Sequence, residues 1–122
     1  MDEARRESFP RHVRIVRGSD FRIAYRDGLR LESERFVLFG RENGLDHPRI
    51  GITVSRKVGG AVVRNRVKRL FREIFRRSRS AISAPIDLVV NARRACVGAG
   101  YHELNAEFLI AVRRLLRLRG SG

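Results

Sequence analysis

One strongly basic stretch, residues 56–79, constrains the fold of this chain more than any other part of its sequence. It holds ten arginine or lysine side chains against one acid, Glu73. The apolar residues in its centre recur at the spacing of one helical face; they are Val63, Val67, Leu70, Phe71 and Ile74. A helix with such a face must pack it on another element, so the fold holds the basic residues as a surface.

The opposite face of this predicted helix is polar and cationic. Asn65, Arg69, Arg72 and Arg76 follow one another at spacings of four, three and four residues. A solvated face with salt bridges is the ordinary interpretation. However, Glu73 cannot balance the cations around it, and like charges at these spacings repel. The whole chain carries a formal charge of +14. We therefore favour a polyanionic partner, with nucleic acid phosphate first.

Apolar patterns predict the elements around the basic helix. We expect a short helix near Asp20–Asp27, with Ser19 as its N-cap and Gly28 as its end. A leucine-rich helix is expected near His102–Leu118. Three strands are expected, at Arg35–Gly40, Arg49–Ser55 and Ile86–Ala92.

The order of these elements predicts an α+β fold, a small mixed sheet with helices packed on it. The second strand, the basic helix and the third strand form a possible βαβ unit, which general statistics make right-handed in about 98% of cases. At 122 residues, one RNA-binding domain over 1–122 is expected, with 1–9 and 119–122 flexible.

Enzyme and membrane motifs are not evident in the sequence. It has no phosphate-binding glycine loop, no Ser-His-Asp signature and no metal-ligand spacing around His12, His47 or His102. The single cysteine, Cys96, is expected to be a small, partly buried hydrophobic residue in a reducing, cytoplasmic protein. No window reaches about 18 apolar residues, and residues 1–20 lack a signal-peptide core. We expect no catalytic side chain, no bound metal and no membrane partner.

The amino-acid sequence of the basic stretch resembles the signature of one protein family. Residues 54–76 read VSRKVGGAVVRNRVKRLFREIFR, which is similar to the signature of the bacterial ribonuclease P protein subunit. That signature combines a Lys-Val-Gly loop, an Arg-Asn-Arg triplet and a basic helix. Ser19-Asp20-Phe21, RFVLF, GITVS and DLVVNAR also fall in register, so the resemblance covers about residues 10–118.

The resemblance implies a subunit of a ribonucleoprotein endonuclease that removes the 5′ leader from precursor tRNA. The RNA subunit would be the catalyst, Mg²⁺ would be held through the RNA, and no DNA partner is expected. The βαβ crossover would be left-handed, against the general statistics. Residues implied to contact the catalytic RNA are Arg56, Lys57, Arg64, Asn65, Arg66, Lys68, Arg69, Arg72 and Arg76.

The resemblance also implies a cleft for the single-stranded leader. Its residues here would be Phe21, Tyr25, Val37, Phe39 and Thr53. Alternation supports this cleft, because Val37 and Phe39 lie on one side of their strand, away from Phe36 and Leu38. Thr53 likewise points away from Ile52 and Val54. A core role for Phe21 and Phe39 is the competing interpretation.

Two positions depart from the family pattern, and one other function stays open. Gly60 stands where the family often has asparagine, and Asn91 replaces an apolar residue that is usual in its strand. The alternative function is a structural, ribosomal-type RNA-binding protein with no role in cleavage. Dependence on the leader would separate the two functions.

Overall fold

The computed structural model describes residues 11–121. Three helices pack on a four-stranded sheet, which confirms the predicted α+β class. Helices are α2 (Gly18–Asp27), α3 (Ala61–Ser78) and α4 (Tyr101–Ser121), and the short 3₁₀ turns are η1 (Arg11–Val13), η2 (Arg79–Ala81) and η3 (Arg94–Cys96). Strands are β1 (Leu29–Glu32), β2 (Phe36–Glu42), β3 (Arg49–Thr53) and β4 (Ile86–Ala92).

The sheet is mixed, in the order β1-β2-β4-β3. Strand β2 runs antiparallel to both β1 and β4. Strands β3 and β4 are parallel neighbours. The chain passes from β3 through α3 to β4, so the predicted parallel strand-helix-strand unit is present.

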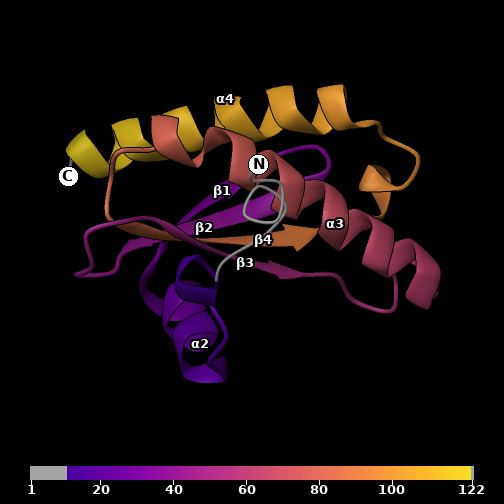
Figure 1. Cartoon of the computed structure of the whole chain (residues 1–122), viewed down its shortest axis with the longest axis horizontal. Coiled ribbons are helices and arrows are strands. Elements are labelled where there is room, and N and C mark those ends of the chain that lie inside the picture. The colour runs from indigo at the N-terminus through magenta and orange to yellow at the C-terminus, as the bar shows by residue number, and fades with distance from the viewer. Residues whose placement is uncertain (1–10, 122) are drawn as a thin grey trace, which may run out of the picture.

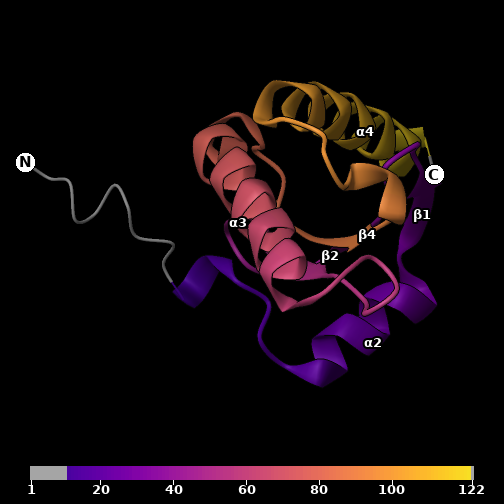
Figure 2. The ribbon, with the colours of Figure 1, turned by 90° about the vertical axis from the view of Figure 1, so that its right-hand side faces the viewer.

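Helices cover the two faces of the sheet unequally. Figure 1 shows α3 and α4 on one face and α2 on the other, and Figure 2 shows α2 and α4 on opposite sides of the strands. The large core lies under α3 and α4, where the Phe36 and Phe71 rings meet edge to face with centroids 5.5 Å apart. A smaller apolar cluster lies under α2 and includes Val37, Phe39 and Val89. The predicted alternation of β2 is therefore confirmed.

Helix α3 buries the face that periodicity predicted. Val67, Phe71 and Ile74 are fully buried, whereas Val63 and Leu70 pack on the edge of the core. Phe75 is buried as well. This apolar anchor is worth several kcal/mol, at about 1.5–3 kcal/mol per fully buried large side chain. It fixes the direction in which the opposite, basic face points.

Three expectations about the ends of elements need correction. Helix α2 begins at Gly18 after Arg17, and Ser19 lies inside the helix, so Ser19 is not its N-cap. Strand β3 ends at Thr53, not Ser55. Helix α4 continues through Ser121, beyond its expected end near Leu118, and Arg119 pairs with Glu42 at 3.0 Å. The expected flexibility of 1–9 lies outside the described residues.

Strand β1 was not predicted from sequence. Its four residues form an edge strand in which only Leu31 is buried, so they carry little alternation. Glycine allows close packing nearby: a Cβ on Gly28, where α2 ends as expected, would lie 2.5 Å from the Ala24 carbonyl oxygen. No helix within the described residues is long and apolar enough to span a membrane.

Candidate RNA-binding surfaces

The sheet face under α2 consists of three rows of side chains, set by strand register. The first row is Val37, Asn91 and Thr53, the second is Phe39, Val89 and Gly51, and the third is Arg41, Asp87 and Arg49. Members of a row lie side by side on β2, β4 and β3 and point to the same face. Together these rows contain three of the five residues predicted to contact the leader.

Helix α2 sits mainly on the second row. The Phe21 ring lies against Gly51, where a Cβ would stand 2.6 Å from the ring atom Cε1. Gly51 therefore leaves the space that seats Phe21. Phe21 is half-buried, and Val37 and Phe39 are each 8% exposed. These three residues hold α2 on the sheet, and only a small part of Val37 and Phe39 is open to a ligand.

Tyr25 is the accessible aromatic side chain of the predicted cleft. It is 37% exposed, and its ring meets Phe39 edge to face with centroids 5.0 Å apart. Its hydroxyl donates a hydrogen bond of 2.9 Å to Asn91 Oδ1. The Thr53 hydroxyl donates to the same oxygen. Tyr25 and Thr53 are thus brought together, as predicted, through a third residue.

Asn91 joins Tyr25 to Thr53 but is absent from the residues predicted to contact the leader. Two hydroxyls converge on its Oδ1, so its amide group is held in one orientation with the NH₂ as the remaining donor. A hollow of about 290 Å³ opens beside Asn91 and Thr53. The signal that could have identified Asn91 was its departure from the apolar residue usual at this position.

The third row closes the other end of this face with a buried ion pair. Asp87 is 1% exposed and accepts hydrogen bonds from Arg49 Nε at 2.8 Å and Nη2 at 2.7 Å. Asn43 Nδ2 donates a third, at 2.9 Å. The hydrogen bonds that Arg49 donates to Asp87 raise the pKa of Arg49. This network is internal, and it leaves the first row as the open part of the face.

The basic face of α3 presents most of the residues predicted to contact the catalytic RNA. Asn65, Arg66, Arg69 and Arg72 are exposed, as are Arg56 and Lys57 in the preceding loop, whereas Arg64, Lys68 and Arg76 are half-buried. Arg64 Nη1 donates to the Gly59 carbonyl at 2.9 Å and ties the helix to that loop.

Most cations of this surface have no acidic partner within the described residues. The acid on α3, Glu73, accepts hydrogen bonds from Arg76 at 2.7 Å and from Arg77 at 2.7 Å. The hydrogen bond from Arg76, followed by that from Arg77, lowers the pKa of Glu73 to about 2. Glu73 therefore stays ionised, yet residues 11–121 give no ion pair to Arg66, Arg69 or Arg72. The face keeps a large excess of positive charge.

The open row and the basic surface adjoin each other. The hollow beside Asn91 is also lined by Val54 and Ser55, which follow β3 directly. Arg56 and Lys57 come next, in a turn closed by a 3.0 Å hydrogen bond from Val58 N to the Ser55 carbonyl. Arg94, which sequence reasoning did not single out, donates to the Lys57 carbonyl at 3.2 Å. One short loop therefore joins the two predicted sites.

The other reactive side chains have structural surroundings. Cys96 is fully buried, where partial burial was expected, and burial raises the pKa of its thiol, which disfavours the nucleophilic thiolate. His47 stacks edge to face with His12 and bonds to Asp46. Between Arg11 and Ser121, no three His, Cys, Asp or Glu side chains gather as a metal site would require.

Comparison with known proteins places this geometry in a family. The family model described as Ribonuclease P matches residues 9–116. The chain belongs to the ribonuclease P protein family. The ribonuclease P protein component of Thermotoga maritima is 46% identical over 88 residues, which are 72% of this chain and 75% of that one. That of Alkaliphilus metalliredigens is 35% identical over 102 residues, 84% and 92% of the two chains.

Solved structures agree with this membership. The Thermotoga maritima ribonuclease P protein superimposes with a TM-score of 0.77 at 35% identity, covering 83% of this chain and 96% of that one. A Staphylococcus aureus ribonuclease P protein mutant gives 0.82 at 31% identity, covering 93% and 96%. The predicted resemblance is confirmed. The chain is an RNA-binding subunit of ribonuclease P, an endoribonuclease of tRNA processing, and its partner is the ribonuclease P RNA.

Proposed function

We propose that this ribonuclease P subunit binds its RNA partner through the basic face of α3 and the single-stranded 5′ leader through the open row of the sheet. The observation that carries the proposal is the Tyr25–Asn91–Thr53 network, which lies beside a hollow lined by Val54 and Ser55, the residues directly before Arg56 and Lys57. An accessible ring, a fixed amide and nearby cations are what an extended nucleotide strand requires.

Each part of the open row supplies a different contact to the leader. The exposed part of the Tyr25 ring can stack on a base, which contributes about 1–3 kcal/mol with little sequence preference. The NH₂ group of Asn91 can donate to a base or sugar oxygen. The leader phosphates would lie toward Arg56 and Lys57. Binding of this kind tolerates leaders of varied sequence.

The basic face of α3 suits folded RNA. Exposed Arg66, Arg69 and Arg72 project from one rigid helix, and each guanidinium can bind phosphate oxygens through two parallel hydrogen bonds. Neutralised phosphates release counterions, so affinity would fall steeply with salt. Asn65 and the half-buried Arg64 and Lys68 complete the surface.

Catalysis in this proposal belongs to the RNA. A protein nuclease of the two-metal type brings several carboxylates to its metal ions. Most of the described carboxylates of this chain instead pair with arginines, as Asp87 and Glu73 do. Mg²⁺ would be held by the RNA, and the protein would position the leader and the catalytic RNA relative to one another.

Leader dependence tests this proposal against a purely structural RNA-binding protein. Precursor and mature forms of one tRNA would be bound to the RNA subunit alone and to the reconstituted holoenzyme, without cleavage. We expect the protein to raise affinity for the precursor much more than for mature tRNA. An equal gain for both would favour the structural alternative.

A further inference from the structure

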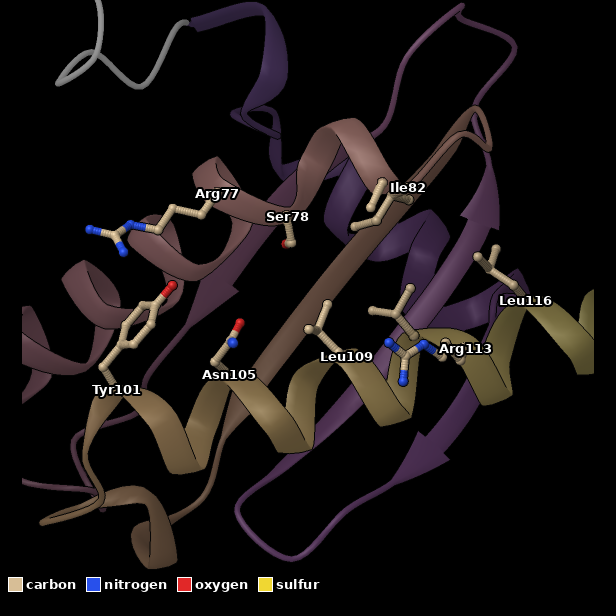
Figure 3. Close-up of a pocket in the computed structure, with 10 residues that line it drawn as sticks. Arg77, Ser78, Ile82, Tyr101, Asn105, Leu109, Arg113 and Leu116 are labelled. Carbon is tan, nitrogen blue, oxygen red and sulfur yellow. The ribbon is translucent and has the colours of Figure 1, made fainter.

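The outer surface of the helical layer contains a groove that neither proposed RNA contact uses. It lies between the end of α3 and α4 and encloses about 320 Å³, within the range of small-ligand sites. Figure 3 shows Arg77, Ser78 and Ile82 on one side, with Tyr101, Asn105 and Leu109 along α4 on the other. The groove lies on the side of the sheet opposite the open row of Val37, Asn91 and Thr53.

The floor of the groove is apolar, but its α4 wall carries polar groups that lack partners. Within the described residues, the Tyr101 hydroxyl, the Asn105 amide and the Arg113 guanidinium make no hydrogen bond or ion pair. Tyr101, Asn105, Leu109 and Arg113 are spaced four residues apart, so they form one stripe along α4. A half-buried asparagine inside a helix has a low helix propensity, and its unpaired amide adds nothing to folding.

Charge defines what the groove can accept. Arg77 and Arg113 line it, and no carboxylate does. The Arg77 guanidinium lies 5.4 Å from the centroid of the Tyr101 ring and closes that end. A matching ligand combines an apolar body, a hydrogen-bonding edge and an anionic group. A nucleotide has all three in one unit, and the RNA partner of this family is built of nucleotides.

The groove is also continuous with the basic face of α3. Arg77 is bonded at 2.7 Å to Glu73, and Glu73 lines a second hollow together with Arg66 and Arg69. RNA bound on the basic face would therefore reach the groove within about one helical turn. We propose that a single unpaired nucleotide of the ribonuclease P RNA inserts its base between α3 and α4, with its phosphate at Arg113.

The base requirement can be measured on the full protein with 5′-AMP as the probe and ribose 5-phosphate as its matched control. NMR signals of the Asn105 side-chain amide and of the Leu109 and Val112 methyl groups would be followed. We expect saturable shifts with 5′-AMP and none with ribose 5-phosphate. Equal shifts with both compounds would mean that the groove binds phosphate without a base, which would contradict the proposal. Shifts confined to other surfaces would also overturn it.

A neighbouring arginine gives the matched control for RNA binding. Arg113 and Arg114 are both exposed, but only Arg113 lines the groove. Arg113→Glu should weaken binding to the ribonuclease P RNA about tenfold more than Arg114→Glu does, since it removes a charge-assisted hydrogen bond. Thermal unfolding of both variants would establish that they fold. Equal losses in the two folded variants would mean only a general charge effect, and would contradict the proposal.

Discussion

The Tyr25 hydroxyl donates a 2.9 Å hydrogen bond to Oδ1 of Asn91, a residue 66 positions further along the chain. This bond joins α2 to the inner strand β4 at the first row of the sheet face under α2. Because Thr53 donates to the same oxygen, helix α2 and strands β3 and β4 are linked at one side-chain amide. The network holds an aromatic ring and a pair of donors in fixed positions beside the basic loop.

Truncating the Tyr25 ring should selectively weaken precursor binding. Tyr25→Ala removes the accessible stacking surface, so we expect the holoenzyme to lose about 1–3 kcal/mol of affinity for precursor tRNA. Tyr25→Phe keeps the ring and should retain most of that affinity. Equilibrium binding of precursor and mature tRNA measures both effects. A similar loss for mature tRNA would show that the ring does not contact the leader.

Restoring an apolar residue at position 91 should separate folding from binding. Asn91→Val fits a strand but removes the NH₂ donors, so we expect precursor affinity to fall by about 0.5–1.5 kcal/mol. The free energy of unfolding should change little, because Tyr25 is exposed and its hydroxyl can bond to water, and the Thr53 hydroxyl lies 3.5 Å from the Val90 carbonyl oxygen, which can accept its hydrogen bond. Urea denaturation checks the folding. An unchanged precursor affinity would remove Asn91 from the leader site.

The buried pair of Asp87 and Arg49 should carry far more stability than an exposed pair of the same geometry. Asp87→Ala leaves Arg49 without its main partner at a buried site, and we expect a loss of about 3–5 kcal/mol in the free energy of unfolding. Asp27 also binds its arginine, Arg26, through two bonds of 3.0 Å, but it is exposed. Asp27→Ala should therefore have little effect in the same urea denaturation. Comparable losses would contradict this account.

Glu73 should stabilise the fold at neutral pH and lose that effect in acid. Its pKa is lowered from 4.5 to about 2, so the folded state favours the ionised form. The contribution is fully present above about pH 4.5 and is lost as the pH falls toward 2. Because the side chain is 34% exposed, screening should limit it to below about 1 kcal/mol. The stability difference between wild type and Glu73→Gln, followed from pH 7 to pH 2, should shrink. A constant difference would contradict the assignment.

Sequence periodicity predicted those parts of the molecule whose partners repeat along one element. The buried face of α3 and the alternation of Phe36 and Phe39 follow from spacing alone. Strand β1 escaped prediction because Leu31 is its one buried residue. The hydrogen bonds of Asn91 could not be predicted from spacing either, since its partners lie 66 and 38 residues away and meet it only in the folded sheet. The contact between the Phe21 ring and Gly51 was likewise not predictable from sequence, because it depends on how α2 packs on the sheet.

A directed crosslink tests most directly whether the leader lies on the open row. Ser55 is exposed and lines the hollow beside Asn91, while the native Cys96 is buried, so we expect labelling at the introduced cysteine. A Ser55→Cys variant would carry a short photoreactive group, with Ser80→Cys on η2 as the exposed control. We predict that, in the holoenzyme with precursor tRNA, the group at position 55 crosslinks to leader nucleotides and the group at position 80 does not. Crosslinks from position 55 to the ribonuclease P RNA alone would contradict the account.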